Sequence, residues 1–176
     1  MKRIAALVLM LAGVGMSLAL AQAPPRPDPW AKLGFLVGEW KGLGTGAPGE
    51  GVGGSIFTFE LDRNILIRKN WAKYPPKPGE TAGITHEDLM TIYPEPGGPG
   101  FKAIYFDNEV HVIRYAASFP GPAGAVVFES EAGAPGPRFR LSYALGADGR
   151  LTVVFSMAMP GADFQEYARG TLVLIS

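Results

Sequence analysis

Two short segments hold most of the side chains that could do chemistry. The first is His86-Glu87-Asp88, and the second runs from Tyr105 to Tyr115. Imidazole, carboxylate, guanidinium and phenol groups can hydrogen-bond a small molecule or move protons on it. The second segment supplies such groups at Tyr105, Asp107, Asn108, Glu109, His111, Arg114 and Tyr115. The candidate ligand-binding residues from these segments are His86, Tyr105, His111, Arg114 and Tyr115.

The pairing within the second segment decides which of its side chains share a face. A loop at residues 107–109 sets Tyr105 opposite His111 and puts both on one face with Tyr115. A shorter, two-residue loop shifts the pairing by one and puts Tyr105 on the face of Arg114 instead. The first register predicts a largely apolar face with a few polar groups, which is typical of a ligand pocket. In the alternative, these side chains point outward or His111 is a satisfied histidine without a ligand.

Arg68 and Trp71 form a second candidate group, because they end a predicted strand shortly before Tyr74. A guanidinium with two neighbouring aromatic rings can form a rim that stacks planar ligands. The alternative is that these residues only cover the end of a barrel.

The residue types present argue against most cofactors and most known catalytic sites. The chain has no cysteine, which excludes thiolate catalysis, iron–sulfur clusters and Cys-type zinc sites. It has two histidines, and we predict no metal site, because zinc sites need three or more ligands. The sequence contains no Gly-x-Ser-x-Gly, no phosphate-binding loop and no His-Glu-x-x-His.

The sequence therefore favours a binding module over an enzyme. We expect a domain that binds a small, largely apolar or amphipathic ligand. One alternative is an enzyme in which His111 works with Tyr105 or Asp107 as acid–base groups. A further alternative is a structural or interaction domain whose loops contact a partner.

The beginning of the chain predicts export. Lys2-Arg3 precedes residues 4–20, which carry no charge and are dominated by apolar side chains. Ala19 and Ala21 provide the small residues that a signal peptidase reads, so residues 1–21 are predicted to be a cleaved signal peptide. An uncleaved membrane anchor is the alternative. We expect the mature protein in the periplasm or the medium, without a membrane contact after cleavage.

The rest of the chain divides into a linker and one domain. Residues 22–29 are rich in proline and predict an extended linker, and residues 30–176 predict a single domain. The whole chain has 16 basic and 16 acidic residues, which gives no electrostatic reason to expect a nucleic-acid partner. The oligomeric state stays open at this point.

Short runs rich in Val, Ile, Phe, Tyr and Thr recur between Gly, Pro, Asp and Asn clusters. Residues 139–143 alternate apolar and polar side chains, which predicts a strand with one buried face. Residues 30–37 predict a short helix or a 3₁₀ turn, and Asp148-Gly149 favours a tight type I′ hairpin. About ten strands are expected, beginning near residues 39, 54, 65, 87, 101, 110, 125, 139, 151 and 165. This pattern predicts an all-β, antiparallel up-and-down barrel, with a two-sheet sandwich as the alternative.

Gly38-Glu39-Trp40, after Phe35-Leu36-Val37, resembles the opening of lipocalin-like and nitrobindin-like barrels. The segments 86–90 and 105–115 are similar to a group of exported bacterial proteins with a lipocalin-like domain and no assigned activity. The resemblance implies that Gly38 and Trp40 begin the first strand and that Trp40 plugs one end of the barrel.

The resemblance does not carry over two ligand sites. Nitrobindin-like barrels hold haem through a histidine on a late strand, but residues 158–176 contain none, so haem and other cofactors are not expected. Fatty-acid-binding barrels hold a carboxylate with Arg-x-Tyr on the last strand. Here the order is reversed, in Tyr167-Ala168-Arg169.

Overall fold

A computed structural model describes residues 28–44, 51–76, 78–121, 123–131 and 136–176. The predicted signal peptide, with Ala19 and Ala21, and most of the predicted linker lie outside these ranges. Among the described residues, no helix is both long and apolar enough to cross a bilayer.

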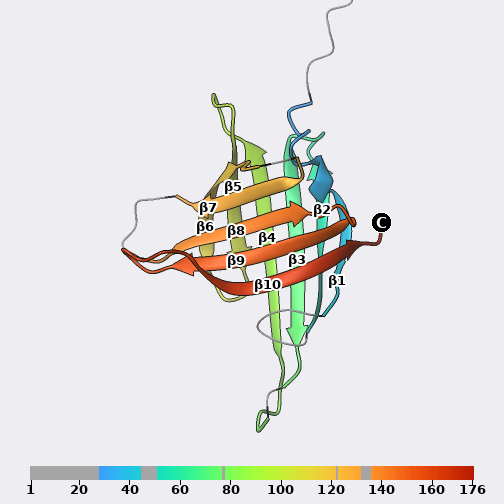
Figure 1. Ribbon diagram of the computed structural model, residues 1–176, viewed down its shortest axis with the longest axis vertical. Helices are drawn as coiled ribbons and strands as arrows, with labels where there is room; N and C mark the ends of the chain where they lie inside the picture. The colour runs from blue at the N-terminus through green and yellow to red at the C-terminus, as the bar shows by residue number, and fades with distance from the viewer. Residues whose placement is uncertain (1–27, 45–50, 77, 122, 132–135) are drawn as a thin grey trace, which may run out of the picture.

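Ten antiparallel strands close into one barrel, in which each strand pairs with its neighbours in the chain and β1 pairs with β10 (Figure 1). The strands are β1 Gly38–Gly42, β2 Val52–Glu60, β3 Ile65–Tyr74, β4 Ile84–Pro94, β5 Phe101–Asp107, β6 Val112–Ser118, β7 Ala125–Ser130, β8 Arg138–Leu145, β9 Arg150–Ala158 and β10 Gln165–Leu174. The predicted up-and-down barrel of about ten strands is confirmed, and the two-sheet sandwich is wrong. Because the ring is closed, no strand keeps an unpaired edge.

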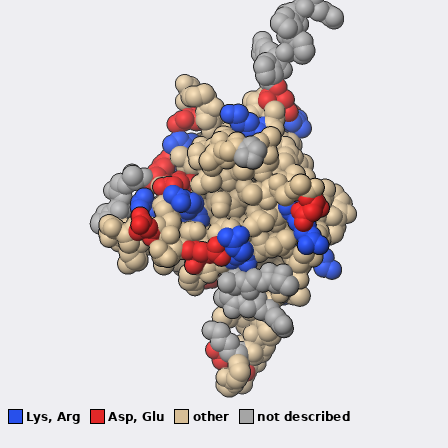
Figure 2. Space-filling model, viewed as in Figure 1, with Lys and Arg blue, Asp and Glu red and all other residues tan. Residues whose placement is uncertain are grey.

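Alternating side chains explain why these segments form the wall of a barrel. In β8, Leu141 and Tyr143 are buried inside, and the intervening Arg140 and Ser142 face out. Figure 2 shows Lys and Arg side chains beside Asp and Glu side chains on the surface. Arg140 and Glu129 form one such outward pair. Each strand thus has one apolar face toward the core and one face toward water.

One end of the barrel is sealed, and we call it the closed end. The chain enters here through a turn and the 3₁₀ helix η1 Gly34–Leu36, so the 3₁₀ alternative for residues 30–37 is confirmed. Trp30, Leu33 and Leu36 are at most 3% exposed. The indole Nε1 of Trp40 donates a hydrogen bond to the Leu36 carbonyl at 2.7 Å. In Figure 1, η1 lies at the top and the β3–β4 hairpin projects from the opposite end.

Side chains fill the middle of the barrel. Arg68 on β3 reaches across to Tyr143 on β8, where its Nη1 donates to the phenol oxygen at 2.6 Å. Phe57 and Phe128 both contact the Tyr143 ring edge-on, at centroid distances of 5.6 and 6.4 Å. A ligand could therefore reach only the part of the interior that lies on the far side of this layer from the closed end.

The Asp148-Gly149 turn differs from the prediction. A type I′ turn needs positive φ at both central residues, but only Gly149 has it, at φ 75. The Gly149 N–H donates to the Gly146 carbonyl at 3.0 Å, so the turn begins one residue earlier than a tight hairpin centred on Asp148-Gly149 would. The longer loop fits the sequence because Gly149 adopts the positive φ that its last position requires.

Candidate functional site

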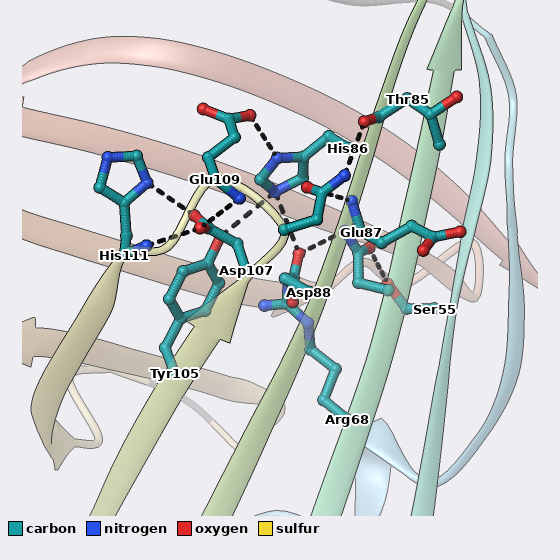
Figure 3. A network of polar contacts seen from close by, with 12 residues as sticks. Ser55, Arg68, Thr85, His86, Glu87, Asp88, Tyr105, Asp107, Glu109 and His111 are labelled. Carbon is teal, nitrogen blue, oxygen red and sulfur yellow. Dashed lines mark hydrogen bonds and ion pairs between the residues drawn. The ribbon is translucent and has the colours of Figure 1, made fainter.

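A group of polar side chains lies at the barrel end opposite the closed end, which we call the mouth. Most of them come from inward-facing positions of β2 to β5, and the others from the β5–β6 hairpin (Figure 3). We name this group the mouth cluster, and it consists of Ser55, Arg68, Asn70, His86, Asp88, Tyr105, Asp107, Glu109 and His111.

Asp88 joins the deepest members of the mouth cluster. Its Oδ1 accepts from Arg68 Nη2 at 2.5 Å, and its Oδ2 accepts from Asn70 Nδ2 at 2.7 Å. The Ser55 hydroxyl in turn donates to Asn70 Oδ1 at 2.6 Å. Arg68 and Asp88 are only 4% and 7% exposed. A buried ion pair is stable only when hydrogen bonds satisfy the remaining polar atoms, and these neighbours do so for the carboxylate.

One polar atom of the pair is not satisfied. Arg68 Nε is buried and has no hydrogen-bond partner among the described residues. Burial by itself lowers the pKa of Arg68, but the attraction of Asp88 carries that pKa above its ordinary value. Arg68 therefore stays charged beside Asp88.

His86 sits above Asp88 and contacts three other members of the cluster. Its Nε2 is 3.4 Å from Asp88 Oδ2 and 3.2 Å from the Tyr105 hydroxyl, and its Nδ1 is 3.0 Å from Glu109 Oε1. The hydrogen bond to Asp88 and the smaller contribution of Glu109 raise the pKa of His86 to about 9, against the opposing effect of burial. At neutral pH the ring is an imidazolium, and both nitrogens donate.

Asp107 organises the rim of the mouth. Its Oδ1 accepts from the backbone N–H groups of Glu109 and His111, at 3.0 and 2.9 Å. Its Oδ2 accepts from the Tyr105 hydroxyl at 3.2 Å and is 2.9 Å from His111 Nδ1. Burial opposes ionisation, but the hydrogen bonds from His111 and Glu109 hold the pKa of Asp107 below its ordinary value. Asp107 thus links the buried cluster to His111, whose side chain is 59% exposed.

The β5–β6 pairing matches neither predicted register. Tyr105 lies opposite Ile113, and the Asp107 N–H donates to the His111 carbonyl at 3.3 Å. The prediction that Tyr105 opposes His111 is therefore wrong, because the loop extends to Val110, which adopts a φ of 66. The partner of Tyr105 is thus two residues further along the chain than a loop at residues 107–109 predicts, Ile113 in place of His111. Because side chains alternate with a period of two, Tyr105, His111 and Tyr115 still share the inward side, as that register predicts.

The other candidate residues are not members of the mouth cluster, although Tyr115 adjoins it. Tyr115 is 1% exposed and packs edge-on against Tyr105 at 6.4 Å, inside the core. Arg114 lies outward on β6, paired with Ile104. Trp71 lies outward on β3, beside hollows of about 470 and 120 Å³ in the outer wall. Gly38 and Trp40 belong to β1, and the Trp40 side chain is held at the closed end.

An aromatic surface lies on the opposite wall of the barrel and was not predicted as part of a site. Phe139 and Phe155 stack with centroids 6.0 Å apart, and Tyr167 contacts Phe155 edge-on at 6.1 Å. In the ring of ten strands, β9 stands five places from β4, so Phe155 and His86 come from opposite walls. Both phenylalanines face inward yet are only half-buried.

Sequence reasoning also missed Ser55 and Asn70 as members of the site. The available signal was a polar residue at an inward position in two adjacent strands, where an apolar residue is expected. That signal requires the strand register, which the sequence alone did not provide.

Within the described ranges, no group of three or more His, Cys, Asp or Glu side chains is placed to hold a metal ion. Comparison with known proteins identifies no family: no family model matches this chain, and no curated protein matches it significantly. The assignment that the structure supports is the fold itself, a closed antiparallel barrel of ten strands compatible with a lipocalin-like barrel.

Proposed function

We propose that this protein is an exported, lipocalin-like barrel that binds a small, largely apolar or amphipathic ligand at its mouth. The proposal depends on one observation. His86 comes from one wall of the barrel and Phe139 and Phe155 come from the opposite wall at the same end, and all three side chains are incompletely buried.

The contrast between the two ends supports this assignment. At the closed end, Trp30, Leu33 and Leu36 are at most 3% exposed, as expected of a finished core. At the mouth, the His86 side chain is 27% exposed, and Phe139 and Phe155 are half-buried although they face inward. When an apolar molecule covers inward-facing aromatic surface that is partly exposed, the free energy of the complex falls, because apolar area is removed from water.

The geometry also indicates how such a ligand would lie. Its apolar body would cover Phe139 and Phe155, and its polar end would meet Tyr105 and His86 on the opposite wall. The Arg68–Tyr143 contact forms the floor and limits how deep the ligand can reach. A few polar groups that converge beside apolar surface are typical of small-molecule sites.

A dye titration with a matched pair of variants tests this proposal. Nile red, a neutral apolar dye, is titrated into wild-type protein and into Phe155→Ala and Val154→Ala, which change neighbouring inward and outward residues of β9. We expect Phe155→Ala to weaken dye binding by about tenfold, corresponding to roughly 1.4 kcal/mol of lost apolar contact, and Val154→Ala to leave it unchanged. Thermal unfolding checks that both variants remain folded.

Native mass spectrometry of protein purified from its own host would identify a co-purified ligand. Absence of dye binding to the wild-type protein, or an equal loss in both variants, would contradict a binding site at the mouth. Turnover of a bound compound that is lost in His111→Ala at unchanged dye affinity would instead indicate the acid–base enzyme.

A further inference from the structure

The outer wall of β2 to β6 carries an unusual amount of exposed apolar surface. Trp71 is 39% exposed, Leu89 37%, Phe106 43% and Val112 58%. The strand register places Leu89 next to Phe106, and Phe106 next to Val112, on the outward side. We name this surface the outer strip, and it consists of Ile56, Lys69, Trp71, Glu87, Leu89, Phe106 and Val112. Several large apolar side chains exposed on one face of a folded domain mark an interaction surface.

Two charged residues of the outer strip, Lys69 and Glu87, alternate with two apolar residues across β3 and β4. On β3 and β4, Lys69 pairs with Leu89, and Trp71 pairs with Glu87. The four outward side chains therefore stand at the corners of a quadrilateral. The apolar pair, Trp71 and Leu89, occupies one diagonal, and the charged pair, Lys69 and Glu87, occupies the other. Among the described residues, neither Lys69 nor Glu87 takes part in any of the ion pairs formed on this wall or elsewhere.

We propose that the outer strip is the contact surface between two copies of this chain. In a two-fold contact, each residue on the axis meets its own copy, and residues on either side of the axis exchange partners. An axis along the Trp71–Leu89 diagonal brings apolar side chains onto their own copies. It also places Lys69 of each copy opposite Glu87 of the other. One copy thus supplies both the apolar centre and the complementary charges that the surface needs.

The outer strip has two hollows that could receive large side chains of a partner. A hollow of about 470 Å³ lies between Trp71, Leu89 and Phe106, with Lys69 and Glu87 at its border. A smaller hollow of about 120 Å³ lies on the other side of Trp71, over Gly54. A Cβ at Gly54 would stand 2.7 Å from the Trp40 carbonyl oxygen, so no side chain fills that space. Side chains from a second copy can enter such hollows as they enter the interior of a core.

Charge exchange at the two positions tests the two-fold arrangement directly. In Lys69→Glu alone, two glutamates face each other across the axis, and in Glu87→Lys alone, two lysines do. We expect each single variant to dimerise at least ~tenfold more weakly than wild-type protein, because like charges repel at an interface. A mixture of the two single variants places opposite charges together again at both positions. That mixture is expected to form heterodimers with about the wild-type affinity, as is the double variant with itself.

Sedimentation velocity over a concentration series measures each dissociation constant. The matched control exchanges Glu129 and Arg140, an ion pair on the outer wall of β7 and β8, and is expected to leave dimerisation unchanged. All four substituted positions are exposed or half-buried on the outer face, and thermal unfolding checks that each variant is folded. Wild-type protein that stays monomeric up to ~100 µM would overturn the proposal. So would single variants that dimerise normally, or a mixture that fails to associate.

Discussion

Arg68 and Asp88 hold opposite charges in the interior of the barrel, where an isolated charge would be costly. The Arg68 guanidinium donates to Asp88, and Tyr143 and Asn70 accept or donate the hydrogen bonds that water would otherwise make. His86 extends this arrangement toward the mouth as a third charged group. The ionisation of His86 is therefore tied to the folded state, because the unfolded chain has no fixed carboxylates beside it.

The pH dependence of stability follows from the pKa of His86. Folding raises this pKa from 6.5 to about 9, so the folded state binds the proton more tightly than the unfolded state does. The stabilisation is complete below about pH 6.5 and is lost as the pH rises through about 9. We expect the free energy of unfolding of wild-type protein to fall over this window more steeply than that of His86→Gln. Urea unfolding at several pH values measures both slopes, and equal slopes would show that His86 is not coupled to folding.

The β5–β6 hairpin shows how one element positions the rim of the site. Asp107 ends β5 and accepts the backbone N–H groups of Glu109 and His111, which holds the loop in a defined shape. The cost lies at Val110, whose φ of 66 is rare for a β-branched residue. Val110 is 94% exposed, so no packing compensates for this conformation. The loop shape comes from the hydrogen bonds of Asp107 rather than from the residue that adopts the unusual conformation.

Replacement of Val110 should therefore stabilise the protein. Glycine adopts positive φ without steric cost, so we expect Val110→Gly to raise the free energy of unfolding by about 1 kcal/mol. Val112→Gly is the matched control, since the same change within β6 should lower it by about 0.5–1 kcal/mol. Urea unfolding measures the change in the free energy of unfolding for both variants. A loss of stability in Val110→Gly would show that the conformation of Val110 carries no strain.

Pairing of the first strand with the last closes the ten strands into one barrel. The first and last strands meet where β1 pairs with β10 and the Glu39 N–H donates to the Ser176 carbonyl at 2.8 Å. This approach requires glycine at position 38, which has a φ of 129. A Cβ at Gly38 would stand 2.6 Å from the Ser176 carbonyl oxygen and 2.7 Å from Leu174 Cδ1. Barrel closure and a single glycine are thus directly linked.

Gly38→Ala should weaken this closure. We expect the substitution to lower the free energy of unfolding by roughly 2–4 kcal/mol, because both the backbone conformation and the contact with the C-terminal strand must change. Gly34→Ala is the control, since a Cβ there meets nothing within 4 Å and should have little effect. Hydrogen exchange of β1 and β10 locates the change, and unaltered protection at Gly38→Ala would contradict the link.

Local pattern alone predicted much of the fold. Alternation at Phe139, Leu141 and Tyr143 indicated the inward face of β8, and the structure confirms it. The strand starts were also close, because Gly and Pro mark turns through their own backbone preferences. The mouth cluster was found only in part. His86 and Tyr105 were identified by residue type, but Arg114 and Trp71 turned out to lie on the outer wall.

The sequence by itself determined the class of fold, the inward face of β8 and the absence of thiol chemistry, since these depend on residue type and near neighbours. Only the tertiary structure decided which side chains meet. Arg68 and Tyr143 are 75 positions apart and touch because ring closure brings β3 and β8 to facing walls. The register of β5 with β6 also depended on the hydrogen bonds of Asp107, which no periodicity encodes. Polar residues such as Asn70 became part of a site because the register of β2, β3 and β4 placed them around one buried charge.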